Sequence, residues 1–350
     1  MVTTSAVRTR LWRDGTLKQE DFPLEQLSDL LDEEGALVWV DLCDPDSATL
    51  KDLAGELCLD RHAVEDAIAH GERPKATRHK THTFVTAYAT SLSSDGTGEL
   101  QSRLRLTRVS AFVLPRGVVT VRHHDGFDMD TVLERWDENS DLLALGPGAL
   151  LHGLLDVIVD GHFETIQQLD DAIESLEDGL FDEQASTHET QQRTYRVRKE
   201  LVELRRVVLP MREVVNSVLR HRTELGREGT ELDGWYSDLY DHVLRASEWT
   251  ESLRDMVTTV FETTLSLQDA RLNTVMKKLT GWAAIIAVPT AVTGWFGQNV
   301  PYPGFGKPSG LIATSVVIVV LAAGLYAVSD AAAGSSRESR SVVAVSPARG

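Results

Sequence analysis

Residues 279–306 read LTGWAAIIAVPTAVTGWFGQNVPYPGFG, and residues 308–329 read PSGLIATSVVIVVLAAGLYAVS. Neither stretch contains a charged residue. A helix needs about 20 predominantly apolar residues to cross the hydrocarbon core of a bilayer, and each stretch contains a core of that length. The sequence therefore predicts a two-span transmembrane helical hairpin, with Phe296-Gly297-Gln298-Asn299 where the first span leaves the membrane.

The charges predict a cation-attracting body and a membrane orientation. The chain of 350 residues has a formal net charge of −18, and of its acids only Asp330 and Glu338 follow the first apolar stretch. Such a surface attracts cations and repels nucleic acid, so we expect no nucleic-acid partner. The alternative explanation of the charge is simple solubility, which composition alone favours. Lys277 and Lys278 precede the first span, whereas the connecting loop has only Lys307. This bias, and a polar N-terminus without a signal segment, predict a multi-pass protein of the cell (inner or plasma) membrane with both termini cytoplasmic.

The first third of the chain alternates strand-like and helical stretches. The predicted strands are 38–40, 83–88, 111–114 and 118–121, and the predicted short helices are 50–59 and 61–70. Runs of β-branched and aromatic residues favour strands, and their mixture with helices indicates an α/β layer domain. The fold class expected is thus an α/β cytoplasmic domain followed by long helices and the membrane hairpin.

Helical periodicity dominates after Gly148. Apolar residues recur at steps of three and four over 151–176 and 201–218, which predicts two amphipathic helices joined by a polar turn at 182–188. Pro210 should kink the second helix. A third pattern begins at Tyr236, and no Gly or Pro interrupts it before Gly281. We therefore expect one helix that continues into the first span and ends near Phe296.

These patterns divide the chain into seven parts. The expected division is an N-terminal α/β domain over 1–147, antiparallel long helices over 148–234, a stalk helix over 235–280, a pore-lining span over 281–297, an outer loop over 298–309, a second span over 310–329 and a disordered tail over 330–350.

Small and polar residues of the first span share one helix face. Ala283, Ala287, Thr290, Gly294 and Gln298 follow one another at steps of 4, 3, 4 and 4. One interpretation is tight packing on another helix. The other is a pore wall built by several copies of the chain, with Asn299 presenting carbonyl oxygens at the outer mouth. Asn299 is equally suited to cap the helix C-terminus, and the two roles are compatible.

Several motifs together resemble the CorA family of divalent-cation channels. They are Val64-Glu65-Asp66 with Arg73-Pro74-Lys75, Glu200-Leu201-Val202-Glu203-Leu204-Arg205-Arg206, Tyr236-Ser237-Asp238-Leu239-Tyr240-Asp241-His242, Glu251-Ser252-Leu253-Arg254-Asp255, Asn273-Thr274-Val275-Met276-Lys277, Pro289-Thr290 and Gly297-Gln298-Asn299. The resemblance extends over about 60–328 and implies a CorA-like funnel formed by a homopentamer in the lipid bilayer.

The resemblance also implies roles for individual residues. Asn299 would form the outer metal-binding ring, Leu279 and Met276 a hydrophobic constriction, and Asp66 and Asp238 a regulatory Mg²⁺ site between neighbouring subunits. The remaining residues expected along the pore are Asn273, Ala283, Ala287, Thr290, Gly294, Gly297 and Gln298. Glu262 and Asp269 are expected either as rings that concentrate cations or as ordinary charges of the stalk. The transported ions would be Mg²⁺ and further divalent cations such as Co²⁺ and Ni²⁺.

The sequence departs from the family pattern at the selectivity motif. Gln298 stands where the family usually has Met, Ala287 stands where many members have a bulky residue, and the loop after Asn299 contains no acid. A ZntB-like, proton-coupled Zn²⁺ transporter is therefore an alternative, as is a membrane-anchored coiled-coil scaffold. The sequence shows no nucleophile elbow or catalytic triad, so we expect no enzyme and no catalytic residue.

Overall fold

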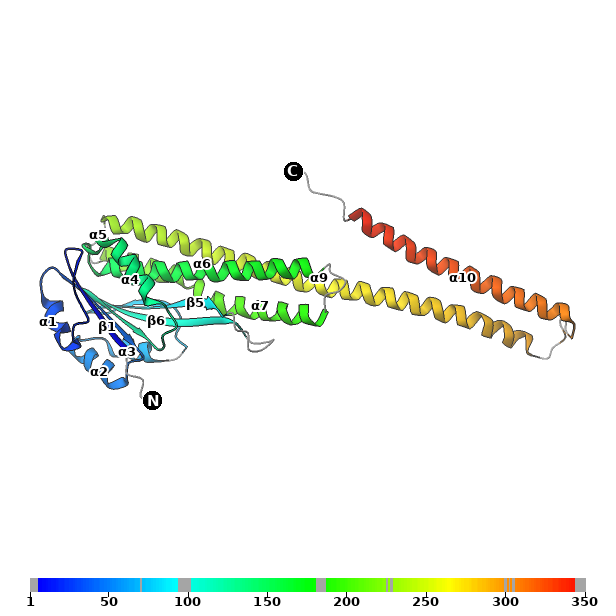
Figure 1. Ribbon diagram of the computed structural model, residues 1–350, viewed down its shortest axis with the longest axis horizontal. Coiled ribbons are helices and arrows are strands. Elements are labelled where there is room, and N and C mark those ends of the chain that lie inside the picture. Colours follow the sequence, from blue (N-terminus) through cyan, green and yellow to red (C-terminus); the bar gives the residue numbers. More distant parts are fainter. Residues whose placement is uncertain are drawn as a thin grey trace. The chain divides into compact units, whose positions relative to one another are not determined.

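The computed structural model describes residues 6–69, 71–93, 102–180, 187–224, 226, 229–298, 301, 303 and 306–343. The chain forms two compact units, Met1–Phe261 and Glu262–Gly350. Figure 1 shows the course of the chain through the helices and strands of both. Gln298 is described, whereas Asn299, the expected metal-binding residue, lies outside the described residues.

A seven-stranded sheet forms the centre of the first unit. Its strands are β1 (Ala6–Arg13), β2 (Thr16–Glu20), β3 (Ala36–Cys43), β4 (Lys75–Arg78), β5 (Thr83–Leu92), β6 (Leu104–Leu114) and β7 (Gly117–Arg122). They lie in the order β2-β1-β3-β7-β6-β5-β4. β3 and β7 are parallel, whereas every other neighbouring pair is antiparallel. The predicted strands correspond to β3, β5, β6 and β7.

Helices cover both faces of this sheet, because apolar residues alternate to both sides of its central strands. Val38, Val40 and Leu42 of β3 belong to the core beneath α1 (Leu27–Asp32), α2 (Ser47–Glu56) and α3 (Arg61–Ile68). Leu37 and Trp39 belong to the opposite core, with residues of α4 (Met129–Glu138) and α6 (Pro147–Gly179). Figure 1 shows α1–α3 on one side of the sheet and α4 and α6 on the other. The α/β prediction is confirmed as a three-layer arrangement.

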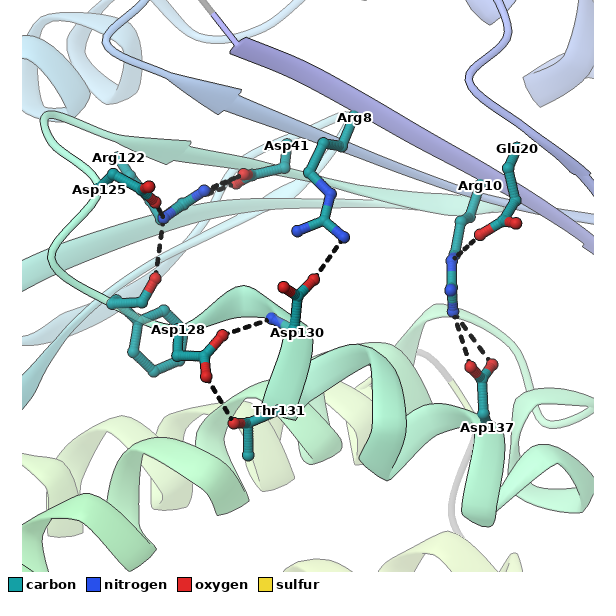
Figure 2. A network of polar contacts seen from close by, with 11 residues as sticks. Arg8, Arg10, Glu20, Asp41, Arg122, Asp125, Asp128, Asp130, Thr131 and Asp137 are labelled. Carbon is teal, nitrogen blue, oxygen red and sulfur yellow. Dashed lines mark hydrogen bonds and ion pairs between the residues drawn. The ribbon is translucent and has the colours of Figure 1, made fainter.

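Sequence reasoning missed β1, β2 and β4 because charged residues interrupt them. β1 carries Arg8, Arg10 and Arg13, and their guanidinium groups reach carboxylates. Figure 2 shows Arg8 paired with Asp130 and Arg10 paired with Glu20 and Asp137. Arg8 and Arg10 thus join β1, which lies between β2 and β3, to α4.

A buried ion pair joins the parallel strands at the centre of the sheet. Arg122 of β7 donates from Nη2 to Oδ2 of Asp41 in β3 over 2.6 Å. The same guanidinium donates to the carbonyl of Phe127 and to Asp125 (Figure 2). Burial lowers the pKa of Arg122, but the hydrogen bonds to Asp41 outweigh burial and raise it. Asp41 is 0% exposed, and a carboxylate buried to this degree is strongly destabilising unless a counter-charge pairs with it.

The long helices follow the predicted periodicity, with one change. All eight apolar-face positions predicted over 151–176 are buried in α6, including His162. The second predicted helix is two helices, α7 (Thr187–Val208) and α8 (Met211–Glu224). Pro210 separates them, since its ring and missing N–H disrupt a continuous helix. The polar turn expected at 182–188 falls largely outside the described residues, but His188 already lies in α7.

The third periodic pattern forms one helix, α9 (Glu231–Phe296). Tyr236, Leu239, Val243, Leu253 and Val260 are each at most 1% exposed, as expected for a face packed on the core. α9 contains 66 residues, which corresponds to a length of roughly 100 Å. The prediction of an uninterrupted helix from the domain core to the first span is confirmed.

In the part of the chain that the structure describes, two helices are long and apolar enough to cross a membrane, namely α9 and the segment Pro308–Val328 of α10 (Pro308–Val343). Their apolar windows have mean hydropathies of 1.4 and 2.5. α10 continues past Asp330, where the sequence led us to expect a disordered tail. The run Ala331-Ala332-Ala333 has high helix propensity, which favours continuation of the helix.

Candidate functional site: the exposed stripe of α9 and two separate carboxylates

The predicted stripe lies on one uninterrupted helix. Ala283, Ala287, Thr290 and Gly294 belong to the apolar end of α9, and all are exposed in the single chain. Gln298, two residues beyond the helix end, is also exposed. At 100° per residue these positions lie within about 80° of one another on the helix circumference. The stripe is therefore a continuous surface that no described part of the chain covers.

The opposite face of the same segment differs in both size and exposure. Gly281, Ile285, Val288 and Val292 are only partly exposed, and they lie about 180° from the stripe. The stripe thus belongs to the exposed side of the helix, which also carries Trp282, Ile286 and Trp295, whereas the opposite face is partly covered. The contrast favours contact of the stripe with something outside the single chain.

An apolar seam continues the stripe along α9 in the direction of the N-terminus of the helix. Leu272, Met276 and Leu279 are 62%, 57% and 62% exposed. They are spaced by four and three residues, as are the a and d positions of a coiled coil. Asn273 and Glu262, the other predicted pore residues, are exposed on the same side of α9. Exposed leucines in this spacing are typical of helices that associate with copies of themselves.

The end of α9 depends on the glycine of the predicted motif. The Gly297 amide donates to the carbonyl of Thr293 over 2.9 Å, one turn back. A Cβ atom at position 297 would lie 2.9 Å from the same carbonyl oxygen. Real Cβ atoms essentially never approach backbone that closely, so a larger residue would shift this turn. Gly297 thus fixes how the chain leaves the helix toward Gln298.

The two predicted regulatory carboxylates have different surroundings. Asp66 lies on α3, and its Oδ2 accepts a hydrogen bond from Nζ of Lys75 over 2.7 Å. The same ammonium donates to Oε2 of Glu72 over 2.8 Å. Burial lowers the pKa of Lys75, but the hydrogen bonds to Asp66 and Glu72 outweigh it and raise the pKa, so the ammonium stays charged. Sequence reasoning included Lys75 in a motif but did not predict this pairing.

The backbone around Asp66 is fastened to the sheet. Arg108 of β6 donates to the carbonyl oxygens of Ala67 and Ala69, at the C-terminal end of α3. The hydroxyl of Tyr88 in β5 donates to the carbonyl of Glu72. These bonds hold the segment that carries Asp66, Glu72 and Lys75. No sequence pattern predicted this role of Arg108. The role depends on which segment of the chain the fold places next to β6.

Asp238 lies on α9 and is largely open to solvent. Its side chain is 69% exposed, and Oδ2 lies 3.6 Å from Nε2 of His242. Among the described residues, no contact joins Asp238 to Asp66, and no group of three or more His, Cys, Asp or Glu side chains could hold a metal ion. A metal site that uses both carboxylates therefore requires a second copy of the chain.

The pair His79 and His82 lies partly inside the first unit. With no Cys or further His at ligand spacing, the sequence indicates that His79 and His82 are surface histidines, but His82 is only 4% exposed. Its ring stacks on His79, with centroids 4.9 Å apart, and packs beside Phe112. The pKa of His82 is lowered to about 4, mainly by burial and to a smaller extent by the nearby His79. The expectation of two surface histidines is wrong for His82, because it lies immediately before β5 and enters the core there.

Comparisons with known proteins agree with this architecture. The family model for the CorA-like Mg²⁺ transporter protein matches residues 34–328. The chain is 26% identical over 289 residues to the putative metal ion transporter YfjQ of Bacillus subtilis, covering 81% of this chain and 86% of YfjQ. It is 29% identical over 264 residues to the cobalt/magnesium transport protein CorA of Thermotoga maritima, covering 74% and 73%.

A solved structure has the same fold. The complete structure of the CorA magnesium transporter from Methanocaldococcus jannaschii matches with a TM-score of 0.71 at 21% identity. The match covers 94% of this chain and 98% of that one. The family model spans both the sheet domain and the two apolar helices. The chain belongs to the CorA-like Mg²⁺ transporter protein family and is a CorA-like divalent cation transporter of the membrane.

Proposed function

We propose that this chain is one subunit of a homopentameric channel that imports Mg²⁺ into the cytoplasm, with Co²⁺ and Ni²⁺ as further permeant ions. The observation that carries the proposal is the stripe Ala283, Ala287, Thr290, Gly294 and Gln298, exposed on α9 opposite a partly covered face. Five such stripes around an axis would form a narrow polar wall. The names of the T. maritima and M. jannaschii relatives, which specify cobalt and magnesium, support this choice of ions.

The residues at the end of α9 suit a hydrated cation. Mg²⁺ gives up its water ligands reluctantly and usually keeps several of them in proteins. The side chains of Gln298 and Asn299 are neutral amides, whose oxygens can accept hydrogen bonds from the hydration shell without the strong hold of a carboxylate. A ring of such groups at the outer mouth would concentrate the ion and still release it.

The proposed orientation places both termini and the first unit in the cytoplasm. Lys277 and Lys278 at the start of the first span, against a single Lys307 in the loop, support it. With the cell interior negative, the membrane potential then drives cation entry with about 2.3 kcal/mol per charge per 100 mV. Glu262 would help to concentrate the cation at the cytoplasmic end.

Gating would depend on Asp66 and on Asp238 of a neighbouring subunit. Two carboxylates about 4 Å apart repel by roughly 4 kcal/mol at an effective dielectric of 20, and a divalent cation turns this repulsion into a bridge. When cytoplasmic Mg²⁺ falls, the bridge is lost and the subunits separate. The constriction at Leu279 and Met276 then widens and admits water, since hydrophobic constrictions gate by dewetting.

The decisive experiment is ion flux into liposomes that hold the purified protein. We expect Mg²⁺ flux that follows voltage, ignores a pH gradient and is lost in Asn299→Ala. A matched pair tests the stripe. Thr290 lies on it, whereas Thr293 lies about 60° from Thr290 and about 100° from the centre of the stripe. Both hydroxyls donate to the carbonyl four residues earlier. Thr290→Val should lower Mg²⁺ flux several-fold, and Thr293→Val should leave it within two-fold of wild type.

Two other outcomes would change the assignment. Gln298 in place of the methionine usual in CorA proteins, and a loop without an acid, favour a second candidate, a ZntB-like proton-coupled Zn²⁺ transporter. Zn²⁺ flux that needs a proton gradient would establish that function instead. Absence of flux for either ion, with an intact oligomer, would indicate a membrane-anchored scaffold.

A further inference from the structure

Lys75 bridges two carboxylates at the surface of the protein. Its ammonium lies 2.7 Å from Oδ2 of Asp66 and 2.8 Å from Oε2 of Glu72. All three side chains are partly buried: Lys75 is 27% exposed, Asp66 31% and Glu72 29%. Partial burial reduces screening by salt, so the triad is a stronger interaction than an open surface ion pair.

The geometry leaves the ammonium and a metal ion in competition for the same oxygen atoms. Mg²⁺ binds carboxylate oxygens at 2.0–2.1 Å, closer than the ammonium lies to Asp66 now. A metal ion on Asp66 therefore repels Lys75. The backbone cannot relieve this, because Arg108 and Tyr88 hold Ala67, Ala69 and the carbonyl of Glu72. The flexible four-carbon stem of Lys75 can move instead.

We propose that Lys75 is a tethered counter-cation that competes with Mg²⁺ for Asp66, and that Glu72 is the acceptor to which Lys75 withdraws when the metal binds. The balance between these two acceptors then sets the cytoplasmic Mg²⁺ concentration at which the regulatory site fills. This inference rests on the proposed function, because it takes Asp66 as a ligand of the regulatory site.

The proposal predicts opposite shifts for two substitutions. Lys75→Met removes the competitor and should lower the half-saturating Mg²⁺ concentration about ten-fold, which corresponds to about 1.4 kcal/mol. Glu72→Gln leaves Lys75 on Asp66 alone and should raise it several-fold. Lys75→Arg keeps the charge and should stay near wild type. In a Lys75→Met background, Glu72→Gln should change the concentration less than two-fold, because Glu72 acts through Lys75.

The measurement is protection of the purified full-length protein from a protease over a titration with MgCl₂, together with inhibition of its Mg²⁺ flux from the cytoplasmic side. Lys51→Met is the matched control, since it removes the same charge from an exposed position of α2 and should cause no shift. Asp66→Asn should abolish the response in every background. Should Lys75→Met be recovered unfolded, Glu72→Gln still tests the proposal by its opposite shift.

The outcomes separate the two proposals. A wild-type response to Mg²⁺ with no shift in Lys75→Met, or a shift to higher concentration, overturns the role of Lys75 alone. Equal effects of Glu72→Gln with and without Lys75 overturn the withdrawal step and make Glu72 an independent contributor. No response in wild type, or a response unchanged in Asp66→Asn, overturns the regulatory site itself.

Discussion

At the scale of single residues, His162 gives the first unit a dependence on pH. It is 1% exposed on α6, and its Nε2 pairs with the carbonyl of Tyr88 over 2.7 Å. Burial lowers the pKa of His162 from 6.5 to about 4. The unfolded chain therefore binds a proton between about pH 6.5 and 4 that the folded chain rejects. Stability rises with pH across this window and is lost as pH falls through it.

The size of this effect follows from the shift. A difference of about 2.5 pKa units corresponds to about 3 kcal/mol, fully present above pH 6.5. His162→Gln keeps a donor for the Tyr88 carbonyl but cannot titrate. We expect the wild-type advantage in thermal unfolding to shrink as the pH falls from 7 to 4.5. A constant difference between the two proteins across this range would contradict the prediction.

Single residues also show what the sequence could and could not predict about the site. The stripe from Ala283 to Gln298 follows from helical spacing alone, since a continuous α9 places the residues on one face. The pairing of Asp66 with Lys75 was not predicted. Lys75 follows Asp66 by nine positions, and the distance between the two side chains depends on the path of the chain from α3 to β4. The partner of Arg108 depends on the approach of α3 to β6, which no local pattern encodes.

At the scale of elements, the pair Arg122–Asp41 holds the parallel strands β7 and β3 together. Arg122→Leu would leave the carboxylate of Asp41 buried and unpaired, which typically costs 3–5 kcal/mol. We expect a large fall in melting temperature, measured by circular dichroism of the purified protein. Asp125 also accepts from Arg122 but is 87% exposed, so Asp125→Asn should have little effect. Equal effects of the two substitutions on the melting temperature would show that burial of the carboxylate does not determine the loss of stability.

Elements were predicted well where the hydrophobic pattern extended over many residues, and poorly where charged residues interrupted the pattern. The eight buried positions of α6 and the uninterrupted α9 follow from steps of three and four residues. β1 could not be predicted, because its arginines suggest a solvated segment until the carboxylates of α4 are placed beside them. Pro210 marked a break correctly, although the result is two helices rather than one kinked helix.

At the scale of the whole molecule, the seam Leu272, Met276 and Leu279 predicts self-association. Each side chain is more than half exposed in the single chain, and burial of a leucine contributes about 1.5–3 kcal/mol. Leu272→Asn should therefore weaken the proposed pentamer. Thr274→Asn introduces the same side chain about 160° away on α9 and should leave the assembly intact.

Light scattering and native mass spectrometry of the protein in detergent would measure this difference. A pentamer for Thr274→Asn and smaller species for Leu272→Asn is the expected result. Pentamers of equal stability in both variants would place the subunit contacts elsewhere. The family assignment gives the context for this test, because it fixes the architecture of one chain and leaves the assembly to experiment.

The order of the two units along the chain has a consequence for biosynthesis. The unit that ends at Phe261 precedes both apolar stretches, 279–306 and 308–329, so all its residues leave the ribosome before the second span is made. Domains generally fold as units during synthesis, N-terminal first. A body already folded on the side of the ribosome cannot be threaded through a translocation pore. Insertion then involves only the final hairpin, and the timing of synthesis reinforces the orientation that the flanking lysines favour.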